Sequence, residues 1–321
     1  MSDVLVTGAN GFVGRALCLA LQRQGHTAGG LVRRPGGCVE GVREWVHPHD
    51  NFTDLADAWP ATFAPDCVVH LAARVHVMRD GASDPSSAFR ATNVDGALRV
   101  AEAACHRNVR RMVFVSSVKA VAERDGGVPL REDAPWHPED AYGRSKCEAE
   151  QALVEFGART GLDVVVVRPP LVYGPEVRAN FLRMMDVVSR GMPLPLGAIA
   201  ARRSLVYIDN LADALLRCAT DPRAAGGCFH VADDNAPSVT ELIHMLGDAL
   251  GKPARLFPVP VGVLRALGKM SGRSAAIDRL TGSLQLDTGH IKRVLGWQPP
   301  YSTRQGLAAT AAWYRARDTR Q

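Results

Sequence analysis

Several features that define large protein classes are missing from the sequence. Its seven cysteines are dispersed without a C-x-x-C pair, so we expect no disulfide framework and no metal site, but reduced thiols in the cytoplasm. No apolar run reaches about 18 residues, so no membrane span is expected. The arginines are scattered instead of forming a basic stripe, and the formal net charge is only +5 over 321 residues. Nucleic acid is therefore not an expected partner, although a mild positive charge suits an anionic substrate.

A signal for export is also missing. An apolar strand pattern begins at residue 4, which leaves no room for a signal peptide, so a cytoplasmic protein is expected. The most lipid-like segment, residues 259–270, is interrupted by Pro260, Gly262, Arg265 and Gly268. It is predicted to form a short amphipathic helix at the substrate region.

Apolar blocks alternate with helical patterns over the first half of the chain, as in a doubly wound parallel sheet. The predicted fold is therefore α/β, with a Rossmann-type sheet. Gly25 is expected to end the first helix. The predicted strands are residues 4–6, 28–32, 67–71, 111–115 and 164–167, and the predicted helices are residues 11–24, 92–107 and 142–160.

Beyond residue 172 the prolines cluster and the alternation becomes irregular. We therefore expect a cofactor domain over residues 1–172 and a smaller, loop-rich, substrate-binding lobe over residues 173–321. A strand at residues 204–208 and a helix at residues 210–220 are expected to return to the first domain, within a segment of about residues 203–231.

A glycine fingerprint lies between the first strand and the first helix. Gly8 permits a tight turn, Gly11 lets the backbone approach a pyrophosphate, and Gly14 permits close packing of helix and strand. The N-terminus of the helix would supply N–H donors and the positive end of its dipole to the phosphates. This context predicts a dinucleotide site.

The end of the second strand indicates which dinucleotide binds. An NAD site usually has a carboxylate there for the ribose hydroxyls, but residues 30–34 contain none. Arg33 and Arg34 suit a 2′-phosphate, because guanidinium groups bind phosphate bidentately. NADP(H) is favoured over NAD(H), and the alternative is a solvated pair of loop charges.

Tyr142 and Lys146 lie four residues apart, so they share one face of the predicted helix. A free phenol has a pKa near ~10, and a neighbouring ammonium lowers it by favouring the phenolate. Ser116 and Ser117 follow the strand at residues 111–115, where a hydroxyl could bind a reacting oxygen. The alternatives are an ordinary amphipathic helix and serines that cap local backbone.

With these motifs the chain resembles the extended short-chain dehydrogenase/reductases, and within them the NAD-dependent epimerase/dehydratase family that acts on nucleotide sugars. The resemblance implies that Tyr142 is the acid and base, that Lys146 tunes it and holds the nicotinamide ribose, and that Ser117 orients the substrate oxygen. It spans nearly the whole chain, through residues 7–14, 70–73, 92–96, 116–117, 142–146 and 168–175. By this resemblance the cofactor residues are Gly8, Asn10, Gly11, Phe12, Gly14, Arg33, Arg34, Leu71, Ala72, Ala73, Asn93, Ser116, Tyr142, Lys146 and Pro169.

The resemblance also implies a UDP-sugar substrate and a homodimer. Asn180 and Arg203 match the residues that contact the nucleotide diphosphate, and Arg279 is a second phosphate ligand by a looser alignment. Solvated surface arginines remain the alternative.

Two departures from the family pattern narrow the expected reaction. Val118 and Lys119 replace the acidic pair of the 4,6-dehydratases, which excludes dehydration. The missing NAD carboxylate favours a net reductase, and residues 116–119 and 202–206 are similar to those of 4-ketoreductases of bacterial surface polysaccharide synthesis. Those enzymes reduce UDP-2-acetamido-2,6-dideoxy-4-hexuloses to UDP-N-acetylquinovosamine or UDP-N-acetylfucosamine. Lys119 is then a donor to the sugar or a salt-bridged loop lysine.

Two alternatives to this reductase remain. One is an NAD-dependent 4-epimerase of a UDP-hexose or UDP-N-acetylhexosamine, and the other is a non-catalytic NADP-binding protein that keeps only the fold.

Overall fold

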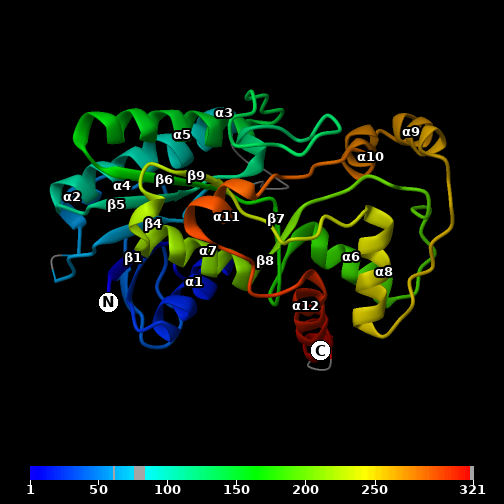
Figure 1. Cartoon of the computed structure of the whole chain (residues 1–321), viewed down its shortest axis with the longest axis horizontal. Helices are drawn as coiled ribbons and strands as arrows, with labels where there is room; N and C mark the ends of the chain where they lie inside the picture. The colour runs from blue at the N-terminus through cyan, green and yellow to red at the C-terminus, as the bar shows by residue number, and fades with distance from the viewer. Residues whose placement is uncertain (61, 76–83, 319–321) are drawn as a thin grey trace.

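A parallel sheet of seven strands forms the centre of the computed structural model, which describes residues 1–60, 62–75 and 84–318 (Figure 1). The order across the sheet is β3-β2-β1-β4-β5-β6-β9. The chain moves outward from β1 to β3 and then crosses back to β4, which confirms the predicted doubly wound α/β fold. The strands are β1 (Asp3–Thr7), β2 (Thr27–Val32), β3 (Arg43–Val46), β4 (Cys67–His70), β5 (Arg111–Val115), β6 (Asp163–Arg168) and β9 (Cys228–His230).

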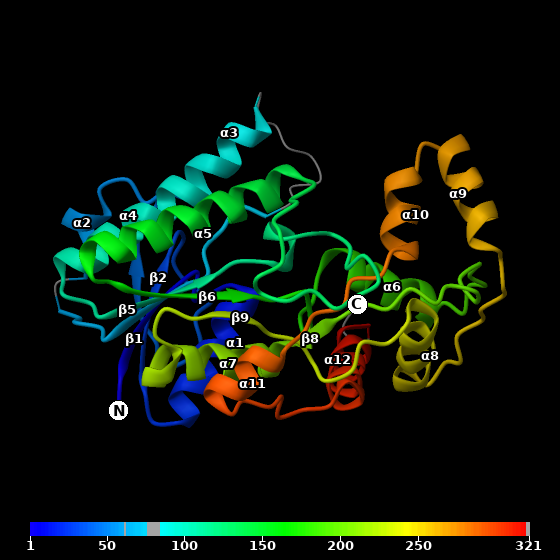
Figure 2. The same cartoon turned by 45° about the horizontal axis from the view of Figure 1, so that its top comes forward.

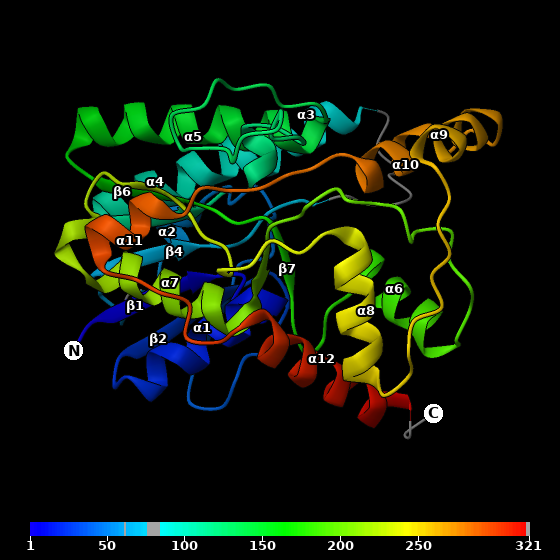
Figure 3. The ribbon, with the colours of Figure 1, turned by 45° about the vertical axis from the view of Figure 1, so that its right-hand side comes forward.

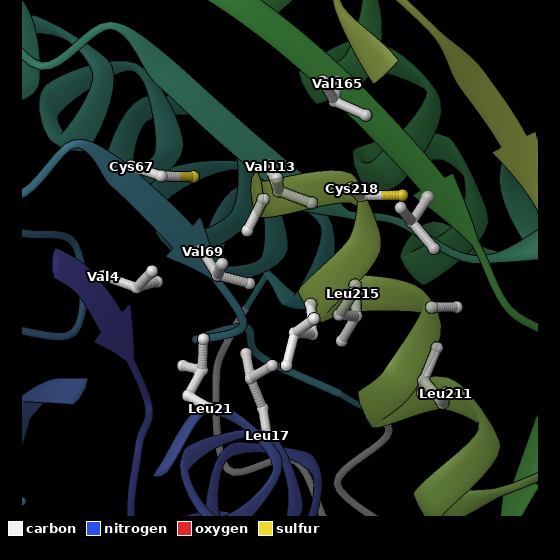
Figure 4. Packing of buried hydrophobic residues seen from close by; sticks show 14 of the residues in the cluster. Val4, Leu17, Leu21, Cys67, Val69, Val113, Val165, Leu211, Leu215 and Cys218 are labelled. Carbon is white, nitrogen blue, oxygen red and sulfur yellow. The ribbon is translucent and has the colours of Figure 1, made fainter. Parts of the chain in front are cut away.

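Helices cover both faces of the sheet, which is why its strands are apolar on both sides (Figure 2). One face carries α1 (Phe12–Arg23), α7 (Ile208–Thr220) and α11 (Gly289–Leu295). Leu17, Leu21, Leu211 and Leu215 from two of these helices pack on the valines of the strands (Figure 4). The other face carries α2 (Leu55–Ala58), α4 (Gly96–His106) and α5 (Ala141–Thr160), with a separate apolar cluster beneath them.

The helix expected at residues 92–107 begins earlier than predicted. It continues from α3 (Pro85–Arg90) through a π-helical turn (Ala91–Asp95) into α4. Asp84 caps this segment by accepting a hydrogen bond from the Ser86 N–H, and Pro85 occupies the first turn. The end of the first helix was predicted correctly, since Gly25 follows it with a φ of +76°.

A second group of elements lies beside the sheet and encloses its own apolar core (Figure 3). The sequence predicts a loop-rich segment, but most of its prolines lie between helices and interrupt none of them. The expected helix near residues 259–270 is present as α9. The group comprises β7 (Leu171–Tyr173), α6 (Ala179–Ser189), β8 (Leu205–Tyr207), α8 (Val239–Leu250), α9 (Val261–Met270), α10 (Ser274–Thr281) and α12 (Thr303–Asp318).

In the segment that returns to the sheet, the predicted helix is confirmed as α7, but the predicted strand does not join the main sheet. β8 pairs with β7 in a separate two-stranded sheet, and the helix α7 begins at once after it. The strand that joins the main sheet is β9, which pairs with β6 and was not predicted. Its three residues form too short an apolar block to stand out in the sequence.

None of the described helices combines the length and apolar composition needed to cross a lipid bilayer.

Candidate active site

The glycine fingerprint forms the turn between β1 and α1. Gly8 adopts a φ of +71°, and its N–H donates to the Leu31 carbonyl at 2.8 Å. A Cβ on Gly14 would lie 2.2 Å from the Gly8 oxygen and 2.7 Å from the Ala9 Cα. The third glycine therefore lets the helix lie directly on the turn, as the spacing predicts.

Thr7 fixes this turn against the end of β4. Its hydroxyl oxygen accepts the N–H groups of Leu71 and Ala72 at 3.1 Å each, and it lies 2.9 Å from Nδ1 of His70. With both lone pairs used, the hydroxyl donates to that ring nitrogen. Burial, with a smaller contribution from Lys146, lowers the pKa of His70 to about 3, so the imidazole is neutral. These contacts between the glycine turn and the end of β4 were not predicted from the sequence.

A cavity of about 860 Å³ opens at the carboxyl ends of β1, β2 and β4, beside the glycine turn. Its position is the crevice where ligands of doubly wound sheets bind, and its size fits the adenosine and pyrophosphate portion of a dinucleotide. Seven predicted cofactor residues line it: Gly8, Asn10, Gly11, Arg33, Leu71, Ala72 and Ala73. Lining residues that the sequence did not indicate include His47, His49, Asp50 and Arg178.

Arg33 is the predicted phosphate ligand that lines the cavity, and it has an acidic partner. Its Nη1 lies 3.8 Å from Oδ2 of Asp50, and both side chains are about half exposed. Asp50 follows β3, so a carboxylate absent from the end of the second strand reaches the cavity from the third. Arg34 is exposed and does not line the cavity, and its backbone carbonyl accepts a hydrogen bond from Asn10 at 3.2 Å.

Tyr142 and Ser117 meet at the carboxyl edge of the sheet. Asp140 caps α5 by accepting the Gly143 N–H at 2.7 Å, which places Tyr142 in the first turn. Burial raises the pKa of Tyr142 to about 12, whereas a hydrogen bond with Ser117 lowers it. The expected drop in this pKa is not found, because burial outweighs the contribution of Ser117, and Asp140 adds to the upward shift.

Lys146 lies one turn further along α5 and is buried. Its Nζ donates to the Val115 carbonyl at 2.9 Å and lies 4.5 Å from the centre of the Phe114 ring. Burial lowers the pKa of Lys146 to about 8, and the Glu150 carboxylate opposes this shift. The ammonium is thus held at the end of β5, directly before Ser116 and Ser117.

Several other predicted cofactor residues hold the site together and do not line the cavity. Asn93, in the π-helical turn, accepts the Arg74 N–H at 2.8 Å and donates to Ser145 Oγ at 2.9 Å. It therefore links the cavity wall to the helix of Tyr142. Ser116 donates to Glu150, Pro169 accepts the Val118 N–H at 3.0 Å, and Phe12 packs against the core of the second group.

The predicted substrate residues gather into a charged cluster, with one exception. Lys119 pairs with Glu123 at 2.8 Å and with Asp140 at 2.6 Å, so its contacts match the salt-bridged alternative. Arg203 donates to the backbone oxygen of Arg279, whose own Nε lies 3.8 Å from Glu123. Asn180 is the exception, because it is exposed in the first turn of α6.

The cysteine thiols and the possible metal ligands were also located. All seven cysteines are free thiols. In the part of the chain that the structure describes, no three His, Cys, Asp or Glu side chains are grouped to hold a metal ion.

Residues 4–232 match the model of the NAD dependent epimerase/dehydratase family. The chain is 39% identical to a UDP-glucose 4-epimerase of Vibrio cholerae, over 96% of this chain and 94% of that protein. It is 31% identical to a UDP-glucose 4-epimerase of Mycolicibacterium smegmatis, over 97% and 98% of the two chains.

A solved structure has the same fold. The UDP-glucose 4-epimerase of Thermotoga maritima, determined with UDP-glucose, superposes with a TM-score of 0.78. The match covers 98% of this chain and 99% of that one, at 24% sequence identity.

Proposed function

Because the chain belongs to the NAD-dependent epimerase/dehydratase family, we propose that it is an NAD(H)-dependent 4-epimerase of a UDP-hexose or UDP-N-acetylhexosamine. The observation that carries the proposal is the 39% identity to a UDP-glucose 4-epimerase over 96% of the chain. The sequence alone favours a 4-ketoreductase with the epimerase as its alternative, and the relatives reverse that order.

In this reaction Tyr142 takes the proton of the sugar 4-hydroxyl and later returns a proton to the same oxygen. Ser117 holds that oxygen through its hydroxyl, which lies close enough to the phenol to lower its pKa. A nicotinamide held in the cavity would supply the redox chemistry, by accepting a hydride from sugar C4 and returning it to the opposite face of C4, which inverts that carbon. Lys146, with its ammonium at the end of β5, favours the phenolate form of Tyr142 and holds the nicotinamide ribose.

The charged cluster that contains Arg203 and Arg279 suits the diphosphate of the substrate. Arg203 and Arg279 lie together, and burial lowers the pKa of the Arg203 guanidinium, which an added anion would oppose. We propose that they bind the diphosphate, with Asn180 at its edge. Residues 1–172 and 203–231 then hold the cofactor, and most of the remaining chain holds the nucleotide sugar.

The proximity of Asp50 to Arg33 supports NAD(H) as the cofactor. The carboxylate partly neutralises the guanidinium and adds a negative charge to the cavity, which disfavours a 2′-phosphate.

The test is an assay of purified protein with UDP-glucose or UDP-N-acetylglucosamine and no added cofactor. The proposal expects the 4-epimer to form, with NAD(H) retained at close to one equivalent per chain. Tyr142→Phe serves as the inactive control. Failure to interconvert either pair of sugars, with cofactor bound, would eliminate the epimerase.

A UDP-sugar 4-ketoreductase remains the second candidate, because Arg33 lines the cavity at the end of β2. Its test is oxidation of NADPH, followed by absorbance, with a UDP-4-keto-6-deoxy-N-acetylhexosamine. Stoichiometric consumption of NADPH, together with no epimerisation, would favour this candidate.

A further inference from the structure

A buried ion pair lies behind the predicted catalytic residues. Arg168, the last residue of β6, contacts Oε2 of Glu150 through Nη2 at 2.6 Å and through Nε at 3.0 Å. The two side chains are only 3% and 2% exposed. Glu150 lies on α5, one turn beyond Lys146 and two turns beyond Tyr142. The proposed chemistry uses neither member of this pair.

Burying two charges is expensive, and an apolar pair of similar volume is often at least as stabilising. The pair therefore calls for a reason other than stability. The remaining contacts of Glu150 and Arg168 suggest such a reason. They connect the pair to Ser117, to Lys146 and to the start of the helix that carries Tyr142.

The first contact leads to Ser117. Ser116 donates its hydroxyl to Oε1 of Glu150, and its backbone N–H donates to the Val167 carbonyl at 2.8 Å. The side chain of Ser116 is thus hydrogen-bonded to α5, and its backbone is hydrogen-bonded to β6. Ser117 is the next residue, so the direction from which its hydroxyl reaches Tyr142 depends on this anchor.

The second contact leads to Lys146. The ammonium is buried, and the Glu150 carboxylate is the group that opposes its loss of a proton. The titratable groups that face Lys146 are Glu150 on its own helix and the neutral His70 of β4. Those that face Glu150 are Lys146 and Cys147 of α5, Arg168 of β6 and Cys228 of β9.

The third contact leads to the start of α5. Arg168 donates through Nη1 to the Glu132 carbonyl at 2.9 Å, and its guanidinium lies 5.7 Å from the centre of the Trp136 ring. The segment that contains both residues runs on to Asp140, the cap of the helix that carries Tyr142.

We propose that Glu150 and Arg168 are positioning residues that hold Ser117 against Tyr142, and that Glu150 also supplies the counter-charge of Lys146. The inference rests on the proposed function for its kinetic readout. It assigns no contact with substrate to either residue.

The principal variant is Glu150→Gln, which keeps the shape of the side chain and removes its charge. We expect kcat to fall by roughly 10- to 100-fold with little change in KM, since small displacements of reacting groups have effects of this size. We also expect the alkaline limb of the pH profile to move about one pH unit lower, because Lys146 loses a nearby negative charge.

Ser116→Ala separates the two roles and provides a milder change if Glu150→Gln does not fold. It removes the hydroxyl that anchors the strand end but leaves the charge of Glu150 in place. The expectation is a lower kcat with the alkaline limb unmoved.

The matched control lies at the other end of the same two strands. Arg111, the first residue of β5, pairs with Asp163, the first residue of β6, at 2.5 Å. Asp163→Asn makes the same chemical change at the sheet edge remote from the site. It should lower the melting temperature and leave both kcat and the pH profile as in the wild type.

A readout that needs no turnover keeps this inference separate from the proposed function. The chain has five tyrosines, so ¹³Cζ-tyrosine labelling gives few NMR signals, and Tyr142→Phe assigns the one of interest. The Tyr142 signal should shift in Glu150→Gln and Ser116→Ala but not in Asp163→Asn. Unshifted signals with wild-type kcat and pH profile in the first two variants would overturn the positioning role. If the signals shift but the protein epimerises no sugar, the positioning role is supported and only the proposed function is refuted.

Discussion

Tyr142 lies half-buried between the hydroxyl of Ser117 and the edge of the Phe89 ring, 6.2 Å away between centroids. Since its pKa is raised to about 12, the phenol carries its proton at neutral pH in the free protein, and it can act as a base only where the positive charge of Lys146 favours the phenolate in the reacting complex. Tyr142→Phe removes this proton and little volume. We expect kcat to fall at least ~100-fold, in line with the loss of a general acid and base, with cofactor affinity close to normal. Kinetics and cofactor fluorescence measure the two effects, and wild-type turnover in the variant would refute the role.

Lys146 gives the activity a dependence on pH. Burial lowers its pKa to about 8, so the ammonium is present below that pH and is lost as the pH rises through it. If the reaction needs this charge, kcat/KM declines on the alkaline side with an apparent pKa near about 8. A pH profile of the wild-type protein from neutral to alkaline conditions checks this. A profile that stays level well above that value would mean that the charge of Lys146 is not required.

At the scale of elements, the close packing of α1 on the turn that follows β1 depends on Gly14. The atoms that a Cβ would meet are backbone atoms of Gly8 and Ala9, which cannot move aside as a side chain does. Gly14→Ala should therefore cost about 1–3 kcal/mol of stability and weaken binding of the NAD(P) cofactor. Gly262→Ala in α9 is the control, because nothing lies within 4 Å of its Cβ, and a gain of up to about 1 kcal/mol is expected. Urea unfolding of both variants tests this, and equal effects would contradict it.

Asp233 joins β7 and β8 of the second group to the helix α7. Its buried carboxylate accepts hydrogen bonds from the Tyr207 N–H at 2.9 Å, from Asn210 Nδ2 at 2.7 Å and from the Tyr173 hydroxyl at 2.7 Å. Asp233→Ala leaves these donors unpaired, at a cost of roughly 3 kcal/mol or more in the free energy of unfolding.

The neighbouring residue provides the control for this prediction. Asp234 is 60% exposed and pairs with the partly exposed Lys292, so Asp234→Ala should change the free energy of unfolding by at most about 1 kcal/mol. Denaturant titration compares the two variants. A loss at Asp233 no larger than that at Asp234 would show that the carboxylate does not tie these elements together.

At the scale of the whole molecule, the interior thiols report on the integrity of the sheet. Cys67 of β4 and Cys218 of α7 lie in the apolar layer shown in Figure 4, and burial raises the pKa of the Cys67 thiol to about 12. Neither should react with an alkylating reagent at neutral pH until the sheet and α7 separate. Labelling across a urea titration, with mass spectrometry to place the label, should follow global unfolding. Early modification of either thiol would indicate local opening.

Much of the fold could be predicted because its signals are local. A buried parallel strand is a short apolar block, and the predicted strands of the central sheet end within one residue of those observed. β9 was missed because it has three residues, and β8 was assigned to the wrong sheet because an apolar block does not specify its partner. Apart from α9, the helices of the second group were missed because prolines between elements were interpreted as a sign of loops.

The candidate site was predictable to a similar degree. Tyr142 and Lys146 are four residues apart on one helix, so their shared face follows from helix geometry alone. Asp50, which lines the cavity, follows a strand of low apolar content and gave no signal. The role of Glu150 could not be predicted either. A carboxylate on a helix is usually a surface residue, and only the tertiary structure shows that Arg168 of β6 pairs with it.

The sequence by itself determined what short-range geometry controls: the glycine turn, the face shared by Tyr142 and Lys146, and the alternation that produces a doubly wound sheet. The tertiary structure alone decided the charges around these groups. The acidic partners of Arg33 and Lys119, the neutral state of His70 and the pair behind Ser116 each depend on which strands are neighbours and on how far water is excluded. Pairing across the sheet and burial are properties of the folded chain, because residues far apart in sequence set the local dielectric and the nearest charge.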